Sequence, residues 1–133
     1  MSQVVLDTDV WSYLFKKDSR AERYRTHLVG NILCVSFQTV AELYQWAETA
    51  GWGGKRRTRL DIWLRRFVVL GYDDETARLW ARVRAERGRQ GRPIAAQDAW
   101  VAACALRHGY SLVTNNAPDY GGIGALVLVS ETA

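Results

Sequence analysis

The carboxylate of Asp98 is the first candidate for chemistry in this sequence. It is the one charged side chain in the apolar run from Ala95 to Leu106, which has the composition of a buried helix. Burying a carboxylate costs several kcal/mol unless it is paired, hydrogen-bonded or bound to a metal ion, and the dipole at the start of a helix returns only about 0.3–1 kcal/mol. An isolated aspartate of this kind would be explained by a notch in the surface or by a bond to a neighbouring loop.

Four further side chains with carboxylate or amide oxygens lie at positions in the sequence from which they could share a site with Asp98. Asp7 directly follows the first apolar run of the chain, and Glu42 lies in the helical segment that follows the second run. Asn116 and Asp119 lie in the turn-rich segment after the fourth run. We therefore expect a cluster of carboxylates at one edge of one sheet.

Each of these acids also has an ordinary structural explanation. Asp7 or Asp9 could cap a helix, and the segment from Thr39 to Glu42 matches a capping box. Asp119 could hold the turn at Pro118. Taken singly, these explanations are the stronger ones, and it is the convergence of several acids that favours a functional site.

The chemistry that such a cluster predicts is the binding of a hard cation. Carboxylates held close together raise one another's pKa unless a cation lies among them, and oxygen ligands without Cys or His suit Mg²⁺ or Mn²⁺. The two histidines, His27 and His108, fall at predicted helix ends, where surface placement or interaction with the helix dipole explains them. Neither histidine is a convincing catalytic base.

The elements that must position these residues alternate between short apolar runs and helical patterns. The expected strands span residues 4–6, 32–35, 68–70, 110–114 and 126–129, and the expected helices span 10–15, 19–28, 36–50, 57–67, 73–90 and 95–108. This order predicts an α/β fold with a central parallel sheet of four to five short strands and helices on both faces. In such sheets, ligands collect beyond the carboxyl ends of the strands.

Length and composition agree with one domain, residues 1–133, with 48% hydrophobic residues. No apolar run approaches the roughly 20 residues that cross a bilayer, and the first residues lack the pattern of a secretory signal, so we expect a cytoplasmic protein with no membrane partner. Cys34 and Cys104 fall in predicted core elements and are expected to be small core residues.

The net charge of +4 comes from an arginine-rich surface, because only three of the 18 basic residues are lysines. This charge favours a polyanionic or acidic partner. The arginines at positions 78, 82, 84, 87, 89 and 92 are interpreted as a solvated helix face.

Four motifs together resemble a known family. They are Val5-Leu6-Asp7-Thr8-Asp9, the segment Ser36 to Leu43 with Ala41-Glu42-Leu43, the segment Gly91 to Asp98 with Ala102-Ala103-Cys104-Ala105 behind it, and the segment Leu112 to Tyr120. In their order and spacing they resemble the PIN-domain ribonucleases, and more narrowly the VapC-type toxins of bacterial toxin–antitoxin pairs. The resemblance spans the whole chain.

The resemblance implies a PIN-like three-layer sandwich and a Mg²⁺- or Mn²⁺-dependent endoribonuclease. Asp7, Glu42 and Asp98 take the positions of the family's three core acids, which are catalytic residues and metal ligands. Asn116 stands where many members carry a further Asp, and Asp119 matches the acid before the closing aromatic residue, so both are candidate additional metal ligands. The resemblance also implies an RNA substrate, a VapB-like antitoxin partner and homodimers.

Two other classes of protein compete with this hypothesis. A phosphosignalling receiver domain also gathers acids at the ends of parallel strands, but it needs a late lysine, and the last lysine here is Lys55. A PIN-fold module that binds nucleic acid or a partner without catalysis would keep the fold, and the intact acids at positions 7, 42 and 98 argue against it.

Overall fold

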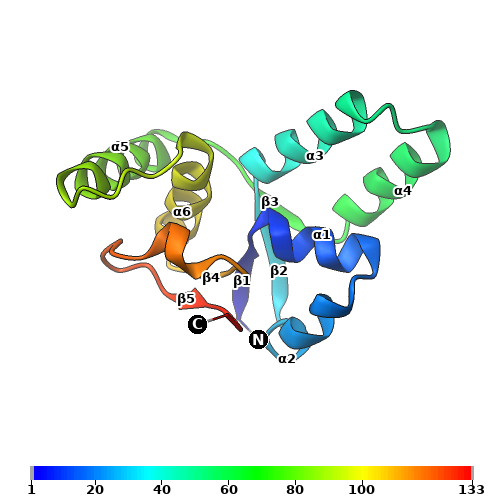
Figure 1. Ribbon diagram of the computed structural model, residues 1–133, viewed down its shortest axis with the longest axis horizontal. Helices are drawn as coiled ribbons and strands as arrows, with labels where there is room; N and C mark the ends of the chain where they lie inside the picture. The colour runs from blue at the N-terminus through cyan, green and yellow to red at the C-terminus, as the bar shows by residue number, and fades with distance from the viewer. Residues whose placement is uncertain (1, 133) are drawn as a thin grey trace.

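The computed structural model describes residues 2–132 as an α/β fold around a parallel sheet (Figure 1). Within these residues the sheet has five strands in the order β3-β2-β1-β4-β5. The strands are β1 Gln3–Leu6, β2 Ile32–Ser36, β3 Val68–Leu70, β4 Ser111–Val113 and β5 Leu128–Val129, and every neighbouring pair is parallel. A receiver domain has the order 2-1-3-4-5, so the strand order excludes that alternative.

The helices follow the predicted alternation and lie in two layers. They are α1 Thr8–Lys16, α2 Arg25–Leu28, α3 Phe37–Thr49, α4 Gly54–Leu64, α5 Asp74–Arg89 and α6 Ala96–His108, with 3₁₀ turns η1 Ser19–Tyr24 and η2 Ala117–Tyr120. In Figure 1, α5 and α6 lie on one side of the sheet, and α1, α2, α3 and α4 lie on the other. The predicted sandwich of helix, sheet and helix layers is confirmed.

The sheet separates two hydrophobic cores because successive residues of a strand point to opposite faces. Val4 and Leu6 of β1 belong to the core that contains Trp11 of α1. Val5, between them, belongs to the core that contains Ala102 of α6. The central strand β1 is therefore buried on both faces, which fixes the position of Asp7 at its end.

Three predicted elements differ from the structure. The predicted helix 19–28 is a 3₁₀ turn capped by Asp18 and followed by a single α-turn. Tyr24, the last residue of the 3₁₀ turn, is fully buried, and its hydroxyl donates to Oδ1 of Asn115, just beyond the end of β4. The helix predicted at 57–67 begins earlier, at Gly54, and ends at Leu64, and the last strand is only two residues long.

Two further expectations concern the cysteines and the membrane. Cys34 and Cys104 are both buried and unpaired, as expected for core residues. None of the helices within residues 2–132 combines the length and apolar character needed to cross a membrane.

Candidate active site

Asp7 is held at the carboxyl end of the central strand by hydrogen bonds of its backbone and of both carboxylate oxygens. Its backbone N–H donates to the carbonyl of Val113 at 2.9 Å, and its Oδ1 accepts from the N–H of Thr8 at 2.9 Å, which caps α1. Its Oδ2 accepts from the Thr114 hydroxyl at 2.8 Å and from the Tyr120 hydroxyl at 3.0 Å. The predicted capping role of Asp7 is confirmed, and the same side chain, which is only 8% exposed, also meets the hydroxyls of Thr114 and Tyr120.

Asp98 lies in the first turn of α6 and faces the same phenol. The Tyr120 hydroxyl is 3.0 Å from Oδ2 of Asp7 and 3.4 Å from Oδ1 of Asp98. A phenol carries one proton, so it donates fully to only one of two ionised carboxylates at a time. The structure thus brings two of the predicted acids to a shared donor that cannot satisfy both.

The pKa values of the acids reflect this crowding. Burial raises the pKa of Asp98 to about 6, and the charges of Asp7, Asp119 and Glu42 add to the rise. Burial also raises the pKa of Asp7, although the bonds from Thr114 and Thr8 oppose this effect. Negative charge is therefore concentrated in a place where solvent compensates it poorly.

Glu42 reaches the site from α3. This helix is capped by Ser36, whose hydroxyl accepts from the N–H of Thr39 at 3.1 Å. The capping box suggested for Thr39 and Glu42 is therefore wrong, because the helix begins one turn earlier and Glu42 lies in its second turn. Among the described residues, Glu42 has no hydrogen-bonded partner, and its side chain lines the same hollow as Asp98.

Asn116 and Asp119 lie together in the lining of this hollow. The amide Nδ2 of Asn116 donates to Oδ2 of Asp119 at 2.5 Å, and both side chains are exposed. The backbone N–H of Asn116 donates to the Thr114 hydroxyl at 3.0 Å, so this turn is connected to the partner of Asp7. Asp119 also helps to form the turn, since its N–H bonds the carbonyl of Asn116.

Asp9, for which the sequence predicts a helix-capping role, also lines this hollow. Its Oδ1 accepts from the N–H of Val10 at 2.6 Å, and its Oδ2 accepts from the N–H of Asn115 at 3.0 Å. Burial and the charge of Asp7 raise its pKa to about 6. Its position two residues after Asp7 is the signal that places it at the same edge of the sheet.

The loop that carries Asp119 and Tyr120 is held from behind by a buried arginine. Arg87 of α5 is only 5% exposed, and its Nε and Nη1 donate to the carbonyls of Arg92 at 2.7 Å and Asp119 at 2.8 Å. The sequence predicts that the arginines between positions 78 and 92 form a solvated helix face, and this prediction is wrong for Arg87. No local pattern reveals its role, because its acceptors are backbone carbonyls of loops outside its own helix.

The hollow between these residues has a volume of about 240 Å³. Its lining includes five carboxylates and no Lys, Arg or His, namely Asp7, Asp9, Glu42, Asp98 and Asp119. In the part of the chain that the structure describes, no three Asp, Glu, His or Cys side chains are grouped so as to hold one ion. The donor set fits a hard divalent cation in its chemistry, since it is rich in oxygen and in uncompensated negative charge.

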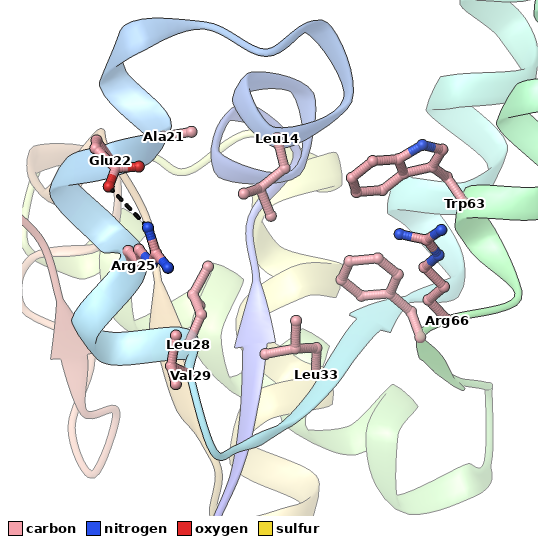
Figure 2. A pocket seen from close by; sticks show the side chains of 10 residues that line it. Leu14, Ala21, Glu22, Arg25, Leu28, Val29, Leu33, Trp63 and Arg66 are labelled. Atoms are coloured by element: carbon pink, nitrogen blue, oxygen red, sulfur yellow. Dashed lines mark hydrogen bonds and ion pairs between the residues drawn. The ribbon is translucent and has the colours of Figure 1, made fainter.

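A larger hollow of about 430 Å³ lies elsewhere and has a different character. Leu14 of α1, Leu33 of β2 and Trp63 of α4 point into it, as Figure 2 shows. Its rim carries Arg25 and Arg66. Its mainly apolar lining makes it a candidate binding surface. The acidic hollow remains the candidate catalytic site.

The fold and the acidic hollow correspond to one protein family. The sequence profile of the PIN domain matches residues 4–117, which include Asp7, Glu42 and Asp98. The chain therefore belongs to the PIN-domain family.

The relatives that match this chain include VapC-type proteins within the PIN-domain family. The tRNA(fMet)-specific endonuclease VapC of Shigella flexneri is 31% identical over 126 residues, which cover 95% of this chain and 96% of that protein. The structure of VapBC-1 from nontypeable Haemophilus influenzae matches with a TM-score of 0.80 and 28% identity over 98% of both chains. VapBC2 from Rickettsia felis, bound to a promoter DNA fragment, matches with a TM-score of 0.84 over 98% of both chains, and at 24% identity this likeness shows the fold alone. The resemblance to VapC-type proteins is confirmed.

Proposed function

We propose that this protein is a Mg²⁺- or Mn²⁺-dependent endoribonuclease that acts in the cytoplasm as the toxin of a toxin–antitoxin pair. The observation that carries the proposal is the convergence of Asp7, Glu42 and Asp98 on one hollow in a PIN-domain fold. The ribonuclease names of the VapC relatives support the choice of RNA as the substrate.

In this proposal, Asp7, Asp98 and Glu42 hold the cation, with Asp119 and Asn116 as additional ligands. Mg²⁺ or Mn²⁺ bound there supplies Lewis-acid polarisation of the scissile phosphate and a lowered pKa for the attacking water. Thr114 and Tyr120 keep the Asp7 carboxylate in one orientation, because each donates to its Oδ2. Glu42, without a protein partner among the described residues, is placed to accept a proton from the attacking water.

Cleavage of RNA by the purified protein in the presence and absence of divalent metal tests this proposal. We expect cleavage of single-stranded or loop RNA in Mg²⁺ or Mn²⁺, loss of cleavage in EDTA, and recovery when metal is restored. The Asp98→Asn variant, purified in the same way, controls for a contaminating ribonuclease. Undiminished cleavage in EDTA, or equal cleavage by the variant, would refute the metal mechanism.

An antitoxin of the VapB type is the partner in this proposal, as the names of the VapBC structures suggest. The apolar groove of Figure 2 is the surface that we assign to it, because its lining suits the apolar face of a helix. Arg25 at the rim is paired with Glu22, which lines the same groove, so Arg66 is the rim cation that favours an acidic residue on that partner. The resemblance also implies that the protein forms homodimers, and we include this in the proposal. Sedimentation of the purified protein at several concentrations tests it.

A further inference from the structure

One face of α3 extends the wall of the acidic hollow beyond the carboxylates. Gln38, Glu42 and Trp46 follow one another at intervals of four residues, and all three line the hollow. Four residues advance a helix by about 6 Å. Trp46 therefore lies about one turn beyond Glu42, at the end of the hollow that is farther from the start of the helix.

Trp46 is not part of the fully buried stripe of its helix. That stripe consists of Thr39, Leu43 and Ala47. Trp46 lies beside it, partly buried against the first core and partly exposed where it borders the hollow. The indole is thus held in place by the core and still presents surface to a ligand in the hollow.

A cation accompanies this indole. The Nζ atom of Lys16, at the end of α1, lies 5.6 Å from the centroid of the Trp46 ring. Lys16 is exposed and makes no ion pair with any other residue between positions 2 and 132. Because the hollow has no basic residue in its lining, an RNA strand that enters it needs a cation of this kind for its neighbouring phosphates.

We propose that Trp46 and Lys16 form a nucleotide subsite next to the scissile phosphate, in which the base stacks on the indole and the ammonium neutralises a phosphate. This inference rests on the proposed ribonuclease function and deepens it. Stacking on an aromatic side chain tolerates every base, so the subsite adds affinity for a nucleotide without selecting a sequence.

A comparison of two ligands separates stacking from charge. The probes are a short fluorescent oligoadenylate and an abasic ribose-phosphate chain of the same length, and their binding is measured on a background of Asp98→Asn, which prevents cleavage. We expect Trp46→Leu to weaken binding of the oligoadenylate roughly 10- to 100-fold and to leave the abasic chain unaffected. Trp46→Phe should retain most of the difference in affinity between the oligoadenylate and the abasic chain. Lys16→Met should weaken the binding of both ligands.

A second indole in the same protein provides a matched control. Trp52 also has a cation over its ring, since the guanidinium of Arg56 lies 4.0 Å from the ring centroid, but it does not line the hollow. We expect Trp52→Leu to leave the preference for the oligoadenylate unchanged. Equal loss for both probes with Trp46→Leu, no loss for either, or no measurable binding of either probe would overturn the subsite.

The outcome for the subsite is distinguishable from the outcome for the proposed function. Cleavage of RNA by the parent protein in Mg²⁺ tests the function, and this experiment uses no Trp46 variant. If the parent cleaves RNA and Trp46→Leu does not selectively weaken binding of the oligoadenylate, the subsite proposal fails and the ribonuclease proposal stands. If the base-dependent loss is found and the parent does not cleave, the ribonuclease proposal fails and the nucleotide-binding site stands.

Discussion

Replacement of Asp98 by asparagine should remove activity and stabilise the fold at neutral pH. The asparagine side chain has nearly the same shape, and its Oδ1 can accept from the Tyr120 hydroxyl as Asp98 does. The substitution removes a negative charge that lies among Asp7, Asp119 and Glu42. We expect the metal-free protein to gain stability because this repulsion is relieved.

The pKa of Asp98 gives the sign and size of the gain. A carboxyl whose pKa is about 6 in the folded protein and about 3.9 when unfolded costs stability only when it is ionised. The cost is absent below about pH 4, grows between about pH 4 and 6, and is complete above about pH 6. At 1.36 kcal/mol per pKa unit the limit is about 3 kcal/mol, and partial exposure of the side chain reduces our expectation to about 1–2 kcal/mol.

Urea denaturation in EDTA at about pH 4 and about pH 7.5 measures this difference. The variant should equal the parent at the lower pH and exceed it by about 1–2 kcal/mol at the higher pH, while cleavage in Mg²⁺ is lost. Asp61→Asn on the exposed surface of α4 is the matched control and should change neither quantity. A variant that is less stable than the parent at about pH 7.5 would refute the reasoning and assign Asp98 a structural role.

Three further predictions concern the surroundings of the acids. Asp119→Ala should raise the metal concentration for half-maximal cleavage and Asn116→Asp should lower it, because the first variant removes a negative charge from the hollow and the second adds one. If Asp119→Ala leaves the metal titration unchanged, Asp119 only forms the turn. Arg87→Met should lower the free energy of unfolding by about 2–4 kcal/mol, since the carbonyls of Arg92 and Asp119 each lose a charged donor. The exposed Arg89→Met should change the free energy of unfolding by less than about 0.5 kcal/mol, and equal effects of the two variants in urea denaturation would contradict the role of Arg87. RNA affinity should fall with salt with a slope of about 0.7 per phosphate neutralised, and Lys16→Met should reduce that slope, which a salt titration of binding checks.

Residues with a local signature could be predicted from the sequence. Asp7 ends an apolar run and Asp98 is the lone charge of an apolar helix, so their types and positions were enough to place them in one hollow with Glu42. The alternation of strands and helices likewise predicted the parallel sheet and its two helical layers.

Contacts between distant segments had no such signature. The hydroxyls of Thr114 and Tyr120 bond Asp7 across 107 and 113 residues, and Arg87 bonds the carbonyl of Asp119 across 32 residues. A sequence pattern reports the periodicity of one element, so it does not show which hydroxyl or guanidinium a fold brings to a carboxylate. For the same reason, the sequence does not show that Tyr24, at the end of the 3₁₀ turn, is buried beside Asn115, 91 residues away.

The long separation between Asp7 and its donors has a consequence for protein synthesis. The ribosome makes Asp7 before both of its hydroxyl donors, because Thr114 and Tyr120 lie 107 and 113 residues later. Until β4 is made, β1 has only β2 as a neighbouring strand. A nascent chain that ends before these residues holds its first carboxylate without the groups that orient it. The full set of side-chain hydrogen bonds that orients the Asp7 carboxylate therefore forms only after synthesis has passed residue 120.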